Sequence, residues 1–149
     1  MRNYDSIRHV KGESHFIDDL RIPEGTLFGY VYYSPIAHGK ILEIDFDKAL
    51  QSKGVAGIYS AKDIPGENQI GGIVLDENLF AEEEVHFIGH PIAIVVADTY
   101  LHAKEASKKI NTIYEKLKPV LDPREAAEKN LLIIPPRKFE LGNVDNAWS

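Results

Sequence analysis

One uninterrupted apolar segment constrains the fold of this chain more than any other feature. In GHPIAIVVADT, at residues 89–99, six apolar residues run from Ile92 to Ala97 without a charge. A run this short indicates a buried strand, because a membrane-spanning helix needs about 20 apolar residues. Since both faces of the strand are apolar, we expect it to lie at the centre of a sheet that is covered on both sides.

The two polar residues after this strand, Asp98 and Thr99, precede the clearest helical segment, YLHAKEASKKI at 100–110. Asp and Thr are common N-cap residues, because a side-chain oxygen accepts a backbone N–H of the first helical turn. Either residue can fill this role. We therefore expect the pair to cap the helix and to take no part in catalysis.

Further segments predict strands and short helices around this central unit. The expected strands are TLFGYVYYS (26–34), KILEIDF (40–46), VAGIYS (55–60), VHFIG (85–89) and TIYEKL (112–117), and the expected short helices are 48–51 and 123–129. Aromatic and β-branched residues with a period of two are typical of the strands. Because 149 residues suffice for one domain only, these elements should share a single core.

Charge and cysteine content exclude several functions. Seventeen Lys and Arg against 23 Asp and Glu give a net charge of −6, so the basic surface of a nucleic-acid-binding protein is missing. The lack of cysteine excludes disulfides, thiolate metal sites and cysteine-bound iron–sulfur clusters within the chain. The first 16 residues also lack the apolar core of a secretory signal. We expect a cytoplasmic protein that binds neither nucleic acid nor membranes.

His86 and His90 form an H-x-x-x-H pair, a spacing that aligns two imidazoles for zinc when it lies on a helix. Gly89 and Pro91 disfavour a helix there. On a strand the two histidines would stand about 13 Å apart, at roughly 3.3 Å per residue, which is too far for one ion to bridge them. We therefore expect no metal site. For His38, in the turn SPIAHGK, we expect a hydrogen bond within its own loop.

The stretch PGENQIGGIVLDENL, residues 65–79, carries the weakest secondary-structure signals. Its GENQIGG segment lacks the Lys-Ser/Thr ending of a phosphate-binding loop, so we interpret it as a flexible connector. Loops of this length within a compact domain are uncommon unless they have a function. Its apolar residues Ile73 and Val74 are therefore of interest.

Several segments together resemble one family. In order, SPIAHGKILEIDFDKAL, GVAGIYSAKDIPGEN, DENLFAEEEVHFIGHPIAIVVADT and YEKLKPVLD resemble the N-terminal a/b hammerhead domain of the molybdenum-binding large subunit of the xanthine dehydrogenase and aldehyde oxidase family. The resemblance implies an α+β fold with a mixed β-sheet and two main helices. It also implies an N-terminal extension at 1–11, the hammerhead domain at 12–128, and at 129–149 a connector toward a molybdopterin-binding domain that is missing.

The resemblance implies a fragment or subunit of a molybdenum hydroxylase, which as a whole enzyme hydroxylates purines, other N-heterocycles or aldehydes. This chain alone would bind no cofactor. Molybdopterin would be held by a partner domain or subunit, and iron–sulfur clusters and FAD by others. The cofactor-contacting glutamine segment and essential glutamate of the family would lie outside this chain, so we expect no catalytic residue within it.

The resemblance also suggests a role for Ile73 and Val74, since the family's apolar residues at this place line the entrance funnel to the molybdenum site. The residues alone allow another interpretation, in which both side chains fill the core of the domain itself. The function of the chain likewise has an alternative, a non-catalytic binding or assembly module with the same fold.

Overall fold

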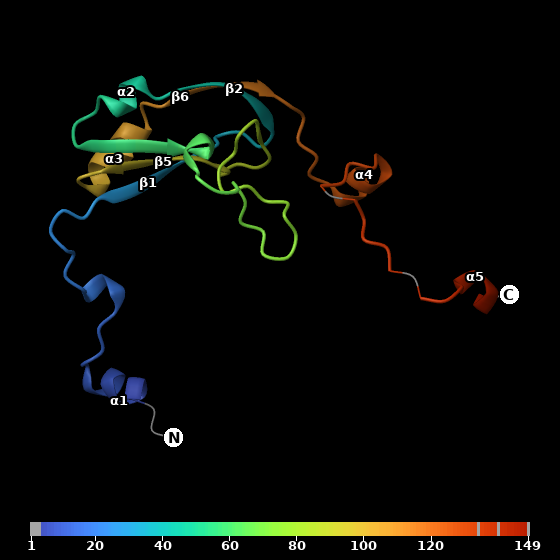
Figure 1. Ribbon diagram of the computed structural model, residues 1–149, viewed down its shortest axis with the longest axis horizontal. Coiled ribbons are helices and arrows are strands. Elements are labelled where there is room, and N and C mark those ends of the chain that lie inside the picture. The colour runs from blue at the N-terminus through green and yellow to red at the C-terminus, as the bar shows by residue number, and fades with distance from the viewer. Residues whose placement is uncertain (1–3, 134, 140, 149) are drawn as a thin grey trace.

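The central apolar strand is β5, Pro91–Ala97, in the computed structural model of the chain (Figure 1). It pairs antiparallel with β1, Phe28–Tyr33, on one side and with β3, Val55–Ser60, on the other. One face is fully buried through Ala93, Val95 and Ala97, and on the other face Ile92 is buried whereas Ile94 and Val96 are half-buried. The central position is confirmed, but the second face is covered only near the start of the strand.

A second sheet is centred on β2, Gly39–Asp45, which pairs antiparallel with β4, Glu84–Val85, and with β6, Asn111–Lys116. The strand expected at 85–89 is therefore wrong over most of its length. The chain turns instead, because Gly89 adopts a left-handed conformation with φ of +91° that a strand does not accommodate.

Helix α3, Tyr100–Ser107, packs on the first sheet. Its contact face consists of Ala103 and Ala106, whose small side chains let the helix lie close to the strands. The short helix α2, Asp47–Leu50, adds Ala49 to the same cluster. The cluster is completed by Val95, Ala97 and Ile110, with Tyr30, Tyr32, Ile44, Phe46, Val55 and Ile58 packed around it.

Thr99 is the N-cap of α3. Its hydroxyl oxygen accepts a hydrogen bond from the backbone N–H of His102 at 3.1 Å. Asp98 instead contacts the side chain of His102, with 2.5 Å between Asp98 Oδ1 and His102 Nδ1. The expectation of a structural role for this pair holds, with Thr99 as the capping residue.

The two sheets share their packing. Ala81, Val85 and Ile92 form a second buried cluster, and the partly buried residues around it are Tyr32, Ile36, Ile41, Ile44 and Tyr114. Tyr32 and Ile44 also pack against the first cluster. The described chain therefore has one continuous core that spans both sheets.

The structure describes residues 4–133, 135–139 and 141–148. The ends of the expected extension and connector, together with positions 134 and 140, lie outside the described residues. Helices α1, Tyr4–Lys11, and α5, Val144–Trp148, were not expected, and both stand away from the sheets (Figure 1). Two short 3-10 helices cover Ile17–Asp19 and Ala61–Asp63. The short helix expected at 123–129 is α4, Pro123–Glu128, with Asp122 as its N-cap.

The chain is α+β, as the family resemblance implied. The strand pairs are antiparallel and belong to two three-stranded sheets, rather than to one mixed sheet. The reason lies in the connection through α3, which leads from β5 in the first sheet to β6 in the second and so creates no parallel pair. Among the described residues, no helix has the length and apolar character needed to cross a membrane.

Candidate functional site

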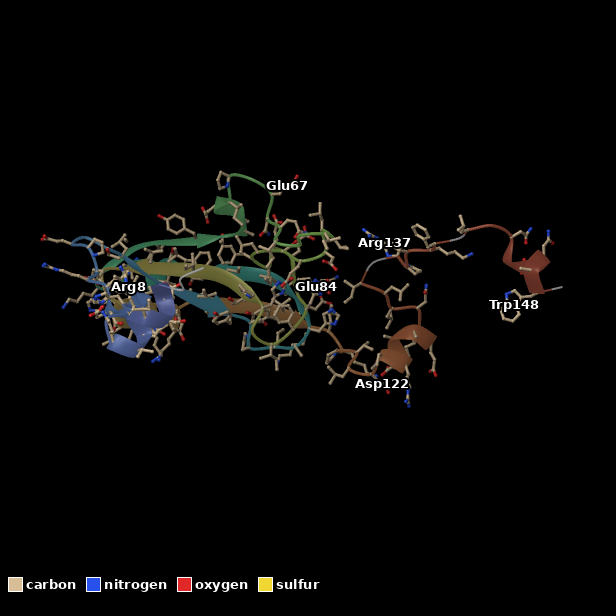
Figure 2. All side chains as sticks on the ribbon, turned by 90° about the horizontal axis from the view of Figure 1, so that it is seen from below. Arg8, Glu67, Glu84, Asp122, Arg137 and Trp148 are labelled. Carbon is tan, nitrogen blue, oxygen red and sulfur yellow. The ribbon has the colours of Figure 1, made fainter. Side chains whose placement is uncertain are left out.

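The candidate site is the loop at residues 65–79. From residue 64 to residue 83 the chain forms neither helix nor strand. Figure 1 shows it as a wide green-to-yellow loop beside the sheets, and Figure 2 shows the part that carries Glu67 rising above the body. The low content of secondary structure that the sequence indicated is confirmed.

The base of the loop is closed by hydrogen bonds. Asn68 Nδ2 donates to the carbonyl of Phe80 at 2.8 Å, and the backbone N–H of Phe80 donates to Asn68 Oδ1 at 2.9 Å. A second link joins the N–H of Ile70 to the carbonyl of Glu77 at 2.9 Å. These bonds give the loop a defined shape in spite of its glycines.

Gly71 forms the tight turn at the tip of the loop. A side chain at this position would collide with the carbonyl oxygen of Val74, so only glycine fits. The N–H of Gly71 also donates to the side-chain oxygen of Gln69. This turn presents the residues that follow it to the surface.

The apolar residues after the turn lie outside the core. Ile73 is 87% exposed and Leu75 is 70% exposed. Val74 is half-buried and belongs to neither core cluster. Because an exposed side chain cannot fill the interior, the core interpretation fails for Ile73. The chain thus presents apolar side chains to solvent on a loop whose base is closed by hydrogen bonds.

Apart from the loop, several polar side chains lie close together beside β4 of the second sheet. His38 Nε2 lies 2.5 Å from Glu84 Oε1, and His38 Nδ1 lies 3.3 Å from the carbonyl oxygen of Lys118. The expected hydrogen bond of His38 within its own loop is therefore wrong. Strand pairing explains the outcome, because Gly39 pairs with both Val85 and Lys116 and so brings His38 between the two neighbouring strands.

His86 joins this group, with its Nδ1 atom 3.7 Å from Glu84 Oε1. One ligand atom from each of His38, Glu84 and His86 lies within 4.8 Å of the other two. Nothing in the local sequence signals this cluster, since His38 and Glu84 are 46 residues apart. The expectation that no metal-binding set exists considered only His86 and His90.

His86 and His90 are closer than a strand would allow. Their ring centroids are 5.8 Å apart, because the chain turns between them. The backbone N–H of His86 donates to His90 Nδ1 at 3.3 Å. Burial lowers the pKa of His90, which is 3% exposed, and the neighbouring His86 lowers it further. A neutral His90 thus anchors the turn that carries His86.

The other buried polar side chains serve the fold. The hydroxyl of Ser34 donates to the carbonyl of Ile36, and that of Ser107 donates to the carbonyl of Lys104, both at 2.8 Å. Within the described residues, the hydroxyl of Tyr114 is buried without a hydrogen-bond partner, and burial raises its pKa.

Comparison with known proteins gives a consistent result. The family model of the aldehyde oxidase and xanthine dehydrogenase a/b hammerhead domain matches residues 11–118. Aldehyde oxidase 4 of Mus musculus is 41% identical over 143 residues, which are 95% of this chain and 10% of that protein. Xanthine dehydrogenase 1 of Arabidopsis thaliana is 44% identical over 117 residues, which are 78% of this chain and 9% of that protein.

Solved structures show the same likeness. A Cu,Mo-CO dehydrogenase superposes with a TM-score of 0.74 at 30% identity, over 85% of this chain and 16% of that one. An aldehyde oxidoreductase from Desulfovibrio desulfuricans superposes with a TM-score of 0.76 at 27% identity, over 83% of this chain and 15% of that one. The chain spans about a tenth of the length of the curated relatives that it matches.

Proposed function

This chain belongs to the aldehyde oxidase and xanthine dehydrogenase family, as its a/b hammerhead domain, and on that premise we propose that it shapes the substrate channel of a molybdenum hydroxylase. The assembled enzyme would hydroxylate a purine, another N-heterocycle or an aldehyde. The family match supports the identity of this one domain, and the activity of the assembled enzyme is our proposal.

The observation that carries the proposal is the exposed position of Ile73 on a loop whose base is closed by hydrogen bonds. Burying an isoleucine side chain typically gains about 1.5–3 kcal/mol, a gain that this loop forgoes in the chain alone. Walls of substrate pockets are mostly apolar, and their residues often lie on loops that a rigid scaffold positions. Ile73 and Val74 would serve as such a wall once a partner domain faces the loop.

The segment at 129–149 would connect the hammerhead domain, at 12–128, to the molybdopterin-binding part. It carries several exposed apolar side chains, namely Leu131, Leu132, Ile133, Phe139, Leu141 and Trp148. In Figure 2 the part that bears Arg137 and Trp148 extends away from the sheets. Such side chains gain stability when a neighbouring domain covers them, which is the role we propose for this segment.

The described residues do not fit molybdopterin by themselves. A pterin with its phosphate needs a group of hydrogen-bond donors, whereas Ser34, His90 and Ser107, the buried polar residues of the described chain, bond to its own backbone. We therefore assign molybdopterin to a partner domain or subunit, and iron–sulfur clusters and FAD to others. A cytoplasmic setting belongs to the proposal, because a cysteine-free chain needs no oxidising compartment.

Co-purification from the native host tests the proposal. We expect the tagged chain to be recovered with a molybdenum-containing partner and with hydroxylase activity. The same chain produced alone should contain no stoichiometric molybdenum by elemental analysis and should not oxidise purines or aldehydes. A partner without molybdenum would favour the alternative, a non-catalytic assembly module. A chain that is monomeric and without partners in its host would contradict the enzyme assignment.

A further inference from the structure

The geometry points to a binding site for a divalent transition-metal ion of the Zn²⁺ class, formed by His38, Glu84 and His86. Two imidazoles and one carboxylate are a ligand set that Zn²⁺ uses in proteins, with a water molecule in the fourth position. This inference does not depend on the proposed function, because it rests on side chains at the edge of the second sheet and not on the loop at 65–79.

The distances between the ligand atoms lie on either side of the spacing that a metal ion requires, one pair closer and one pair slightly wider. Zn–N and Zn–O bonds of about 2.0–2.2 Å place tetrahedral ligand atoms roughly 3.3–3.6 Å apart. In the structure, Glu84 Oε1 lies 2.5 Å from His38 Nε2 and 3.7 Å from His86 Nδ1. The side chains are 28%, 32% and 63% exposed for His38, Glu84 and His86, so a small rotation toward solvent can open the set around an ion.

The second nitrogen of His38 has the partner that a metal-bound histidine needs. Imidazole ligands almost always donate their other ring N–H to a carbonyl or carboxylate, which fixes the tautomer. His38 Nδ1 lies 3.3 Å from the carbonyl oxygen of Lys118 and can donate to it. That tautomer leaves a lone pair on Nε2, which faces the carboxylate of Glu84. Two acceptors cannot bond to each other, so a proton or a cation must lie between them.

The turn that carries His86 is held in place by the buried side chain of His90. His90 accepts the backbone N–H of His86 and stacks on the ring of Phe87, with centroids 4.6 Å apart. His90 is thus a positioning residue for His86. His38 immediately precedes β2, and Glu84 belongs to β4, which pairs with β2. The site therefore forms only when the second sheet is folded. A metal that binds only the folded chain raises its stability by mass action.

Isothermal titration calorimetry of the 149-residue chain, with Zn²⁺ alone as the titrant, tests the inference. We expect saturable binding of one ion per chain. Replacement of a ligand in His38→Gln, Glu84→Gln or His86→Gln should weaken binding by about tenfold or more. His15→Gln is the matched control, since it removes an exposed imidazole outside the cluster. Mg²⁺, which prefers oxygen ligands, should not compete.

A spectroscopic measurement separates a built site from loose histidine binding. Co²⁺ in place of Zn²⁺ should show the visible absorption of a four- or five-coordinate ion in the natural chain, and His86→Gln should lose it. His86 is exposed, so this variant should keep its fold, which circular dichroism can verify. The metal site would be overturned if no saturable Zn²⁺ binding is found, or if the His86→Gln and His15→Gln variants bind Zn²⁺ with equal affinity. His38 and Glu84 would then form an ion pair only.

Discussion

Asn68 and Phe80 are joined by two hydrogen bonds in opposite directions, between the amide side chain of Asn68 and the backbone of Phe80, at 2.8 and 2.9 Å. They close the loop that carries Ile73 at its far end. A loop with a fixed base can hold an apolar side chain at a defined place in a channel, whereas an open loop would not.

Asn68→Ala should open the loop without unfolding the sheets. Each of the two hydrogen bonds contributes about 0.5–1.5 kcal/mol, so the free energy of unfolding should fall by roughly 1–3 kcal/mol. Amide hydrogen exchange in residues 66–79 should become faster, while β5 stays protected. Asn78→Ala, at an exposed position of the same loop, is the control. Unchanged exchange in the loop would show that the pair does not hold it.

Ile73→Ala should scarcely affect the stability of the chain. Substitutions at exposed positions usually change the free energy of unfolding by less than about 0.5 kcal/mol. Ile92→Ala, which removes the same atoms at a fully buried position, should cost about 2–5 kcal/mol. Urea denaturation of both variants measures the difference. A loss of about 2–4 kcal/mol in Ile73→Ala would mean that Ile73 is a core residue.

Gly54→Ala should destabilise the junction between α2 and β3. Gly54 has a φ of +77°, and an added Cβ would collide with the side chains of Asp98 and His102. We expect a loss of about 1–3 kcal/mol for the left-handed backbone conformation alone, measured by thermal or urea unfolding. Gly66→Ala is the control, because its Cβ would meet nothing within 4 Å. Equal stability of the two variants would contradict this account of the junction.

Asp98 should make stability depend on pH in acid. The hydrogen bond with His102 lowers the pKa of the Asp98 carboxyl in the folded chain. A group with a lowered folded pKa stabilises the fold above its unfolded pKa, and this contribution disappears as the pH falls through the folded value. Asp98→Asn should therefore flatten the decline in stability below about pH 4, the ordinary pKa range of aspartate. Identical acid unfolding curves for both chains would refute the assignment.

Elements with a local pattern could be predicted from the sequence. The uninterrupted apolar run predicted β5, and Asp98 and Thr99 before a helical segment predicted a cap for α3, which the structure assigns to Thr99. The strand expected at 85–89 failed because apolar residues alone do not reveal the left-handed conformation of Gly89. Helices α1 and α5 stand away from the sheets, so no core contact imposed an apolar pattern on them that could be recognised.

The polar cluster could not be predicted in the same way. His38 and Glu84 meet through the pairing of β2 with β4, and this register depends on the whole sheet rather than on a motif. Ile73 and Val74 form an intermediate case. Family resemblance suggested that they line a channel, which stays a prediction. The residues alone left core packing open, and the structure excludes it for Ile73, which is exposed.

The most direct test of the central claim is steady-state kinetics of the assembled enzyme that carries Ile73→Ala or Val74→Ala. Each substitution shortens one wall side chain of the proposed channel. The account predicts that the ratio of kcat/KM between a bulky and a small substrate changes by about tenfold or more, the effect of a single methylene-sized contact in an apolar pocket, while molybdenum content stays at the natural level. An unchanged ratio in both variants, at full molybdenum content, would contradict the claim that this loop lines the substrate channel.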